Sequence, residues 1–187
     1  PVAILYWNNS TSDYFLGEER HGLIMDNKTH SYLHKTRGAV LESGGAISGY
    51  TLGDDTAVEI ALGSTAFWDE DLRGTVAAKL VGDNWNQKWY RLGANGDWTV
   101  GGTEDSLPAL HNGSGATYFN EYTGGTWQLS PITDEYYMNL FILATNSADS
   151  ENDFVIIPGQ AEFSSSAAAQ AGESIDSLSL GDLPTPE

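Results

Sequence analysis

Residues 88–100 read KWYRLGANGDWTV, and residues 117–129 read TYFNEYTGGTWQL. Each stretch places two runs of aromatic and polar residues on either side of a turn, which contains Asn95-Gly96 in the first and Gly124-Gly125 in the second. Asn-Gly and Gly-Gly pairs accept the positive φ angles of tight turns, so the pattern predicts two β-hairpins with tryptophan on their strands. The chain is therefore expected to be all-β.

Further stretches have strand character because they are continuously apolar or alternate between apolar and polar residues. They are residues 2–7, 37–41 up to the break at Gly44-Gly45, 58–62 with Val58, Ile60 and Leu62 on one face, 75–81, 136–144 and 154–157. The run YYMNLFILA at 136–144 predicts a central strand buried on both faces, with 154–157 as its neighbour. Many short strands with glycine-rich turns favour an antiparallel β-sandwich or a jelly-roll-like barrel.

Only residues 164–173 (SSSAAAQAGE) have a helical bias. The serines are suited to the N-cap and Gly172 to the C-terminal end of a helix, so one short helix is expected near the C-terminus. Residues 174–187 are expected to be a linker or one last short strand through Leu178 and Leu180. We therefore expect one β-domain over residues 1–173. The start at Pro1, without methionine or leader, favours a piece of a longer protein.

The charge of the chain excludes several partners. It has 187 residues, with 26 acidic and 8 basic side chains and a net charge of −18. Such a surface repels phosphate backbones and anionic lipid headgroups, so nucleic acid is not expected as a partner. No apolar run approaches the ~18 residues of a membrane span, so no membrane insertion is expected. The absence of cysteine excludes thiol catalysis, thiolate metal sites and disulfides.

Two groups of side chains could bind metals, namely His21, His30 and His34, and the alternating Asp149, Glu151 and Asp153. The histidines lie in a stretch that looks turn-rich rather than helical and match no finger or zincin spacing. The acidic group starts like a calcium loop but lacks the glycine and the distal glutamate of an EF-hand. We expect no metal and no cofactor, with calcium at the acidic group left open.

Catalytic motifs are not evident. A glycosidase needs two carboxylates some ~5–10 Å apart, and no pair among the 26 acidic residues is singled out by its position. There is no Gly-x-Ser-x-Gly elbow for a serine nucleophile. We expect no catalytic residues and a non-enzymatic protein, with a glycan-binding or glycan-degrading β-sandwich as the alternative.

The aromatic residues of the hairpins are the strongest candidates for binding. Strand alternation places Trp89 and Arg91 on one face and Tyr90 on the other, so some rings are exposed unless another chain or sheet covers them. They can fill the core, contact another subunit or stack on a sugar. We predict that Trp89, Trp98, Tyr118 and Trp127 are binding residues. We also expect self-association, because symmetric contact with another copy is the commonest way in which exposed rings are covered.

Several segments spread along the chain carry a resemblance to a known family. They are LYWN (5–8), LGEERHG (16–22), RGA (37–39), GGTWQL (124–129), ATN (144–146), IIPGQ (156–160) and SLSLGDLPTPE (177–187). They resemble a domain that recurs in bacteriophage virion structural proteins, often of the tail or fibre. The resemblance implies a module of a virus particle with a structural or adhesion role, whose partners are its own copies, other virion proteins and possibly a host surface glycan. It supplies no functional residues.

Overall fold

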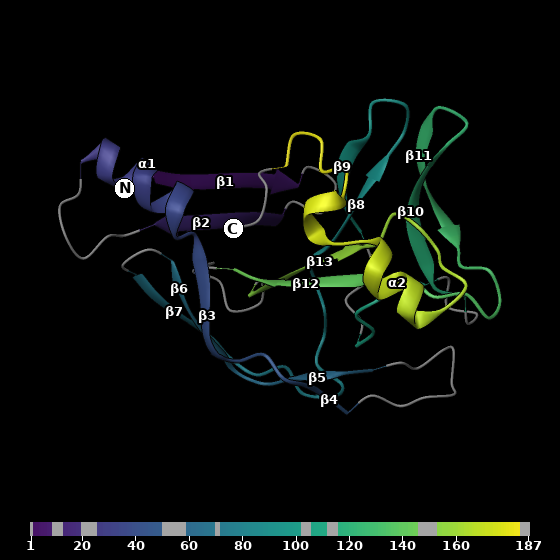
Figure 1. Cartoon of the computed structure of the whole chain (residues 1–187), viewed down its shortest axis with the longest axis horizontal. Coiled ribbons are helices and arrows are strands. Elements are labelled where there is room, and N and C mark those ends of the chain that lie inside the picture. The colour runs from purple at the N-terminus through teal and green to yellow at the C-terminus, as the bar shows by residue number, and fades with distance from the viewer. Residues whose placement is uncertain are drawn as a thin grey trace.

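The structure is a computed structural model that describes residues 2–8, 13–19, 26–49, 59–69, 72–101, 106–111, 116–145 and 153–183. Of the described residues, 45% lie in strands and 14% in helices, which confirms the expected β class. The strands form several small sheets, and none of the described sheets is closed into a barrel (Figure 1). None of the described helices is long and apolar enough to cross a membrane.

The elements follow one another in chain order as β1 (Val2–Asn8), β2 (Asp13–Glu19), α1 (Asn27–Thr36), β3 (Ala39–Gly44), β4 (Ile47–Ser48), β5 (Ala61–Leu62), β6 (Thr65–Asp69), β7 (Leu72–Val76), β8 (Lys88–Leu92), β9 (Asp97–Gly101), β10 (Tyr118–Thr123), β11 (Thr126–Pro131), β12 (Leu140–Ala144), β13 (Phe154–Pro158), α2 (Ser166–Gly172) and η2 (Ile175–Ser177). Five sheets result, with strand orders β1-β2, β10-β11, β12-β13-β8-β9, β3-β6-β7 and β4-β5.

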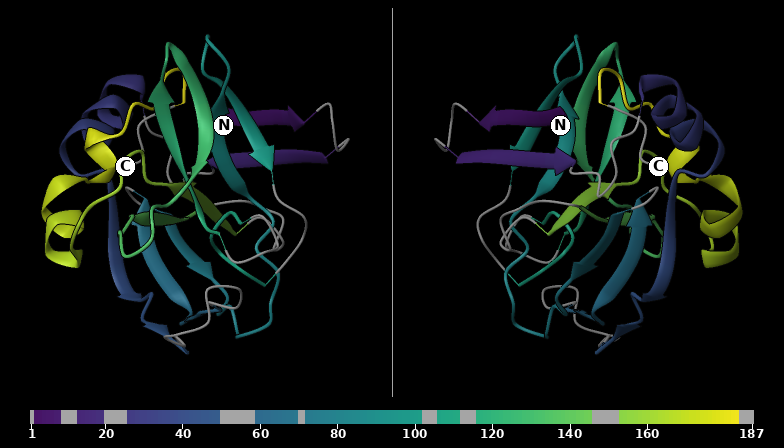
Figure 2. Two further views of the ribbon diagram at one scale, coloured as in Figure 1. Left: turned by 90° about the vertical axis from the view of Figure 1, so that its right-hand side faces the viewer. Right: turned by 90° about the vertical axis from the view of Figure 1, so that its left-hand side faces the viewer.

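Both tryptophan hairpins are confirmed. Strands β8 and β9 pair antiparallel up to Leu92 opposite Asp97, and β10 and β11 pair up to Thr123 opposite Thr126. Gly124 and Gly125 form the two-residue turn with φ angles of +58° and +83°, in the region that favours glycine. The two hairpins stand side by side (Figure 2), because Gly93 and Trp127 exchange backbone hydrogen bonds of 2.9 and 3.0 Å.

The four-stranded sheet corrects the prediction for residues 136–144. Its order places β12 at an edge and β13 inside, and Tyr136 and Tyr137 are exposed. Strand β12 begins only at Leu140, and it pairs antiparallel with β13 as expected. An edge strand has one open flank, and the apolar residues 140–143 of β12 are only half-buried while Ala144 is exposed, whereas β13 pairs with strands on both sides.

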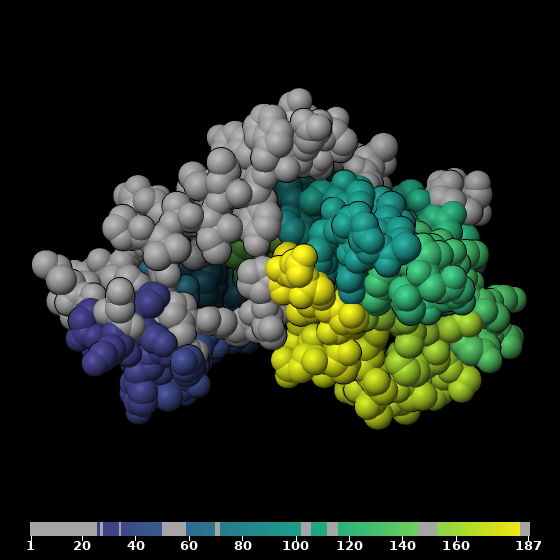
Figure 3. Space-filling view, turned by 90° about the horizontal axis from the view of Figure 1, so that it is seen from above, coloured from purple at the N-terminus to yellow at the C-terminus, as the bar shows by residue number. Residues whose placement is uncertain are grey.

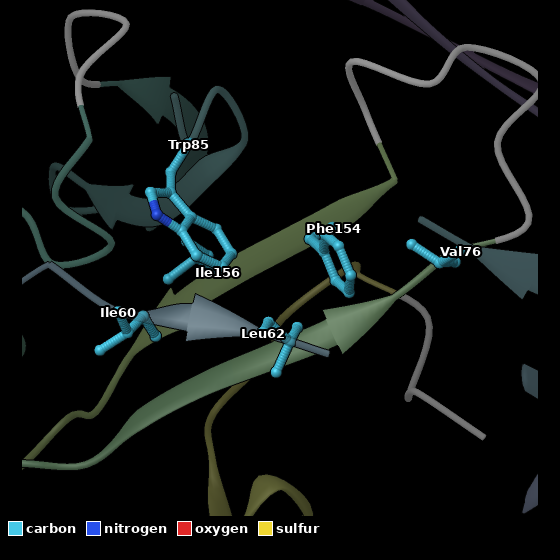
Figure 4. Packing of buried hydrophobic residues seen from close by; sticks show 6 residues of the cluster. All are labelled: Ile60, Leu62, Val76, Trp85, Phe154 and Ile156. Atoms are coloured by element: carbon cyan, nitrogen blue, oxygen red, sulfur yellow. The ribbon is translucent and has the colours of Figure 1, made fainter. Parts of the chain in front are cut away.

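One hydrophobic core lies between the four-stranded sheet and the strands β5 to β7. Its buried members, shown in Figure 4, are Ile60, Leu62, Val76, Trp85, Phe154 and Ile156. Phe67 of β6 packs against it from one sheet, and Leu140 and Ile142 of β12 pack from the other. The alternation predicted for residues 58–62 is confirmed at Ile60 and Leu62, although only Ala61–Leu62 forms a strand and Val58 lies outside the described residues.

A second core lies on the opposite face of the same sheet. Trp89 and Ile157 are buried there together with Leu178 and Leu180 from the end of the chain. Residues 174–187 were expected to be a linker or a last strand, but residues 175–177 form the short helix η2, and no described residue after them lies in a strand. The apolar side chains of this segment instead cover the sheet.

The described residues form two α-helices, besides the short helix η2, rather than the single helix expected. Helix α2 is confirmed, and the Ser165 side chain accepts a hydrogen bond of 3.1 Å from the Ala168 amide at its start. Helix α1 was not predicted. It begins after Asp26, whose carboxylate accepts hydrogen bonds from the amides of Thr29 and Lys28, and these bonds lower the pKa of Asp26. Side-chain capping of this kind starts a helix in a stretch without strong apolar periodicity.

Two strand predictions also change. The polar region after residue 13 contains β2, which pairs with the predicted first strand, β1, from Asn8 opposite Asp13. The strand expected at 75–81 lies earlier, at Leu72–Val76, because β7 pairs with β6 from Asp69 opposite Leu72. Leu80 and Val81, the last two residues of the predicted strand, are exposed.

Candidate functional site

The predicted binding residues Trp89 and Trp98 lie under the C-terminal segment. Trp89 is only 6% exposed, and its ring centroid lies 6.4 Å from that of Trp98. The indole of Trp98 is half-buried and donates a hydrogen bond of 2.7 Å to the carbonyl of Leu180. The chain itself therefore covers these rings, which is the outcome expected if they fill the core.

Arg91 is a buried cation at the junction of the two hairpins. Its guanidinium donates to the carbonyl of Gly96 at 2.8 Å and to the carbonyl and hydroxyl of Ser179 at 3.0 and 2.9 Å. It also lies 4.4 Å from the ring centroid of Trp127. A buried charge needs such partners to offset its lost hydration, so Arg91 joins β8, the first turn, β11 and the C-terminal segment.

Asn120 of β10 links the hairpins through the backbone of Arg91. Its side-chain oxygen accepts from the Arg91 amide at 2.8 Å, and its side-chain nitrogen donates to the carbonyls of Arg91 at 2.9 Å and Gln128 at 3.1 Å. Asn120 is 2% exposed and also donates its own amide to Gly159. Its buried amide group thus satisfies backbone groups from both hairpins.

Trp127 is buried, and its neighbour Tyr122 is the exposed ring of this area. Trp127 is 8% exposed, whereas Tyr122 is 58% exposed, with 5.4 Å between their ring centroids. Tyr118 is half-buried at the other end of the hairpin, opposite Pro131. The four predicted binding residues therefore do not form one open patch, and burial argues against Trp89 and Trp127 as contact residues. Their binding role stays a prediction.

The carboxyl group of Glu173 lies at the end of α2 in a position that desolvates it. Burial raises its pKa, although the Gln160 amide donates to it at 2.6 Å and the Asn139 side chain at 3.3 Å. A carboxyl group with a raised pKa is a candidate general acid. These hydrogen bonds instead engage Glu173 in fastening α2 to the ends of β12 and β13, a structural role.

The described part of the chain contains no candidate metal site. It contains no group of three or more histidine and carboxylate side chains placed to hold an ion. His21, Asp149 and Glu151 lie outside the described residues, as does the side chain of His34. His30 and His34 lie on α1, so the prediction of a turn-rich stretch is wrong for them. The possibility of calcium at 149–153 stays open.

An exposed apolar surface runs along β3 and β4. All six residues of β3 are exposed, and Val40 and Leu41 are 41% and 63% exposed. Ile47 of β4 is 62% exposed. Strand β3 is at the edge of its sheet, and no described strand pairs with its outer side. Such an edge offers both hydrogen-bonding groups and apolar side chains to another chain.

Sequence reasoning missed the roles of Arg91, Asn120 and the β3 edge. Alternation placed Arg91 on the face of Trp89, and a charge on an otherwise buried face is the signal that could have identified it as a structural centre. Asn120 had no such signal, since its role depends on which hairpins are neighbours.

The chain matches no family model, no curated protein and no solved structure.

Proposed function

We propose that this protein is a non-enzymatic structural or adhesion module of a virus particle, which associates with copies of itself and with other particle proteins. The exposed edge strand β3, with Val40 and Leu41 on it, carries the proposal for association. Natural proteins cover or charge such edges, because an open apolar edge promotes pairing with other chains. The virus particle itself is proposed from the sequence resemblance alone.

The aromatic interior supports a structural rather than a catalytic role for these residues. Trp85 is buried in the core of Figure 4, Trp89 and Trp127 are buried within the hairpins, and Arg91 contacts backbone carbonyls and the ring of Trp127. These groups stiffen the framework that presents the surface. We propose a β-sandwich as the architecture, supported by the core of Figure 4, which packs the four-stranded sheet against β5 to β7.

Sedimentation velocity of the purified chain over a range of concentrations tests the association. We expect reversible oligomers, and we expect Leu41→Asp to weaken them while the melting temperature changes little, because Leu41 is 63% exposed. Thr123→Asp, at an exposed position on the distant β10, is the matched control. A chain that stays monomeric at high micromolar concentration would contradict the proposal. Mass spectrometry of purified particles tests the location.

The alternative is a glycan-binding or glycan-degrading domain, and the exposed ring of Tyr122 beside Trp127 is the observation that favours it. Aromatic faces stack on sugar rings. If this alternative holds, Tyr122→Ala abolishes binding to host polysaccharide while the fold is kept, and Tyr136→Ala, at another exposed ring, leaves binding unchanged. Release of reducing sugar would identify an enzyme.

A further inference from the structure

Helix α1 concentrates basic charge on an acidic molecule. Lys28, Lys35 and Arg37 are three of the eight basic residues of a chain whose net charge is −18, and all three are exposed. Lys28, Tyr32 and Lys35 are spaced i, i+4 and i+7, so they share one face of the helix. Tyr32 is 64% exposed. This face, the Lys28–Tyr32–Lys35 stripe, presents two cations on either side of an aromatic ring.

Most side chains of helix α1 whose burial is described are exposed. Six of its eight residues with described side chains are exposed, and only His30 and Leu33 are half-buried. Helices of fewer than about 12–15 residues are marginal in water unless tertiary packing supports them. The ten residues of α1 therefore leave a face that a further packing partner would stabilise.

A turn with the opposite character follows β11. Asp134, Glu135, Tyr136 and Tyr137 are all exposed, so two carboxylates stand next to two aromatic rings. Glu135 has a φ of +65°, the only positive value among the described residues other than glycine. A glutamate in this conformation is strained, and such strain persists where surrounding contacts enforce it, often at functional positions.

Contacts at both ends hold this turn, which we call the 133–137 turn, in one shape. The Glu162 carboxylate accepts from the amide and the hydroxyl of Thr133, both at 2.8 Å. Tyr137 and Phe163 exchange backbone hydrogen bonds of 2.8 Å in each direction. The backbone of the turn is therefore preorganised, and less backbone entropy is lost when the turn meets a partner.

The stripe and the turn cannot meet within one molecule. Helix α1 lies at one end of the long axis and the β10–β11 hairpin, which leads into the turn, at the other (Figure 1). The view from above also separates α1 from the green segments that include this turn (Figure 3). Complementary surfaces at opposite ends of a chain produce head-to-tail contacts between copies, which close into rings or continue as filaments.

We infer that the 133–137 turn of one copy docks on the Lys28–Tyr32–Lys35 stripe of a second copy. This contact rests on the self-association of the proposed function and adds a second pair of surfaces to the β3 edge. Asp134 and Glu135 face the two lysines, and Tyr136 lies against Tyr32. A second copy fits better than an unrelated partner, because the same chain carries both the scarce basic patch and the preorganised acidic turn.

Charge-neutral variants test the contact. We expect D134N/E135N to weaken self-association about tenfold or more in sedimentation velocity, since each lost charge pair removes part of the binding free energy. Asparagine suits position 135 because it tolerates a positive φ. The control D176N/D182N removes the same charge at two exposed positions elsewhere and should associate as the wild type does.

Charge exchange provides a sharper test. K28E/K35E and D134K/E135K should each associate weakly alone, because like charges then meet, whereas their mixture should form alternating oligomers. The chain has no native cysteine, so a disulfide can be directed. Ser31→Cys lies on the same helix face as the stripe, and it should cross-link to Tyr136→Cys of a second copy but not to Asp182→Cys.

The outcomes separate this contact from the proposed function. A wild-type chain that stays monomeric overturns both. A chain that self-associates, but whose D134N/E135N variant associates as tightly as D176N/D182N, overturns only the contact. Equal cross-linking of Ser31→Cys to both cysteine partners, or binding of heparin by the lysines with self-association unchanged in K28E/K35E, also overturns it.

Discussion

Asn120 shows how one side chain can determine the arrangement of two hairpins. Its amide group forms three hydrogen bonds to backbone groups of Arg91 and Gln128. We expect Asn120→Ala to lower the free energy of unfolding by about 2–4 kcal/mol, because it leaves buried backbone groups without partners. Urea denaturation measures this. Asn95→Ala, at an exposed turn position, should change stability by less than ~0.5 kcal/mol, and an equal effect of the two would contradict this role.

Glu173 makes a pH-dependent contribution to stability. Burial raises the pKa of its carboxyl group above the value of the unfolded chain. The folded state therefore binds the proton more tightly, so the contribution of Glu173 is fully present below the unfolded pKa and is lost as the pH rises through the folded pKa. Carbon NMR of the side chain should show a pKa above the ordinary glutamate value.

The Glu173→Gln variant isolates this effect from the other carboxyl groups. We expect the stability of the wild type relative to Glu173→Gln to fall as the pH rises through the folded pKa, as measured by urea midpoints over a pH series. Asp182→Asn, at an exposed position, corrects for the loss of one charge. A difference that does not vary with pH would show that burial does not perturb Glu173.

At the scale of elements, the C-terminal segment acts as the cover of the second core. Leu178 and Leu180 are buried against Trp89 and Ile157, and the carbonyl of Leu180 accepts from the indole of Trp98. We expect Leu178→Ala to cost about 2–5 kcal/mol through lost burial and the cavity that remains. Tryptophan fluorescence should shift to the red as water reaches the rings. Leu80→Ala, at an exposed leucine, should change neither quantity.

Secondary-structure elements were predicted best where turn chemistry is local. Gly124-Gly125 and Asn95-Gly96 identified both hairpins, since the positive φ of a tight turn depends on the turn residues themselves. The alanines and serines at 164–173 identified α2, because helix propensity and capping also depend on the residues of the segment itself. Strand β12 was placed wrongly, because a continuous apolar run does not distinguish an edge strand from a central one. Helix α1 was missed because the capping role of Asp26 was not recognised.

At the scale of the whole molecule, β13 joins the two cores. Ile156 faces the core of Figure 4 and Ile157 faces the second core, and each is 1% exposed. If the chain is one domain, it should unfold in a single transition. Ile156→Ala and Ile157→Ala should then each lower the free energy of unfolding for that transition by about 2–5 kcal/mol. Calorimetry together with fluorescence measures this. Two separate transitions, each sensitive to one variant, would contradict a single domain.

The sequence by itself determined the β class, the two tryptophan hairpins and the helix at the C-terminal end. It also determined the acidic charge, which any fold must carry. These properties depend on residue type and on neighbours a few positions away, because turn angles, strand alternation and helix capping are local. The sequence also indicated that rings on both faces of the hairpins are exposed unless another segment packs on them, since strand alternation places residues on both faces whatever the topology.

Only the tertiary structure decided which side chains became the surface. Leu178 and Leu180 reach Trp89 from about ninety residues away, so the ring of Trp89 lies in the second core. The exposed side chains of the described residues include those of α1, β3 and the 133–137 turn, whose apolar and charged side chains look ordinary in the sequence. Burial depends on contacts between distant segments, and no local pattern encodes which segments become neighbours.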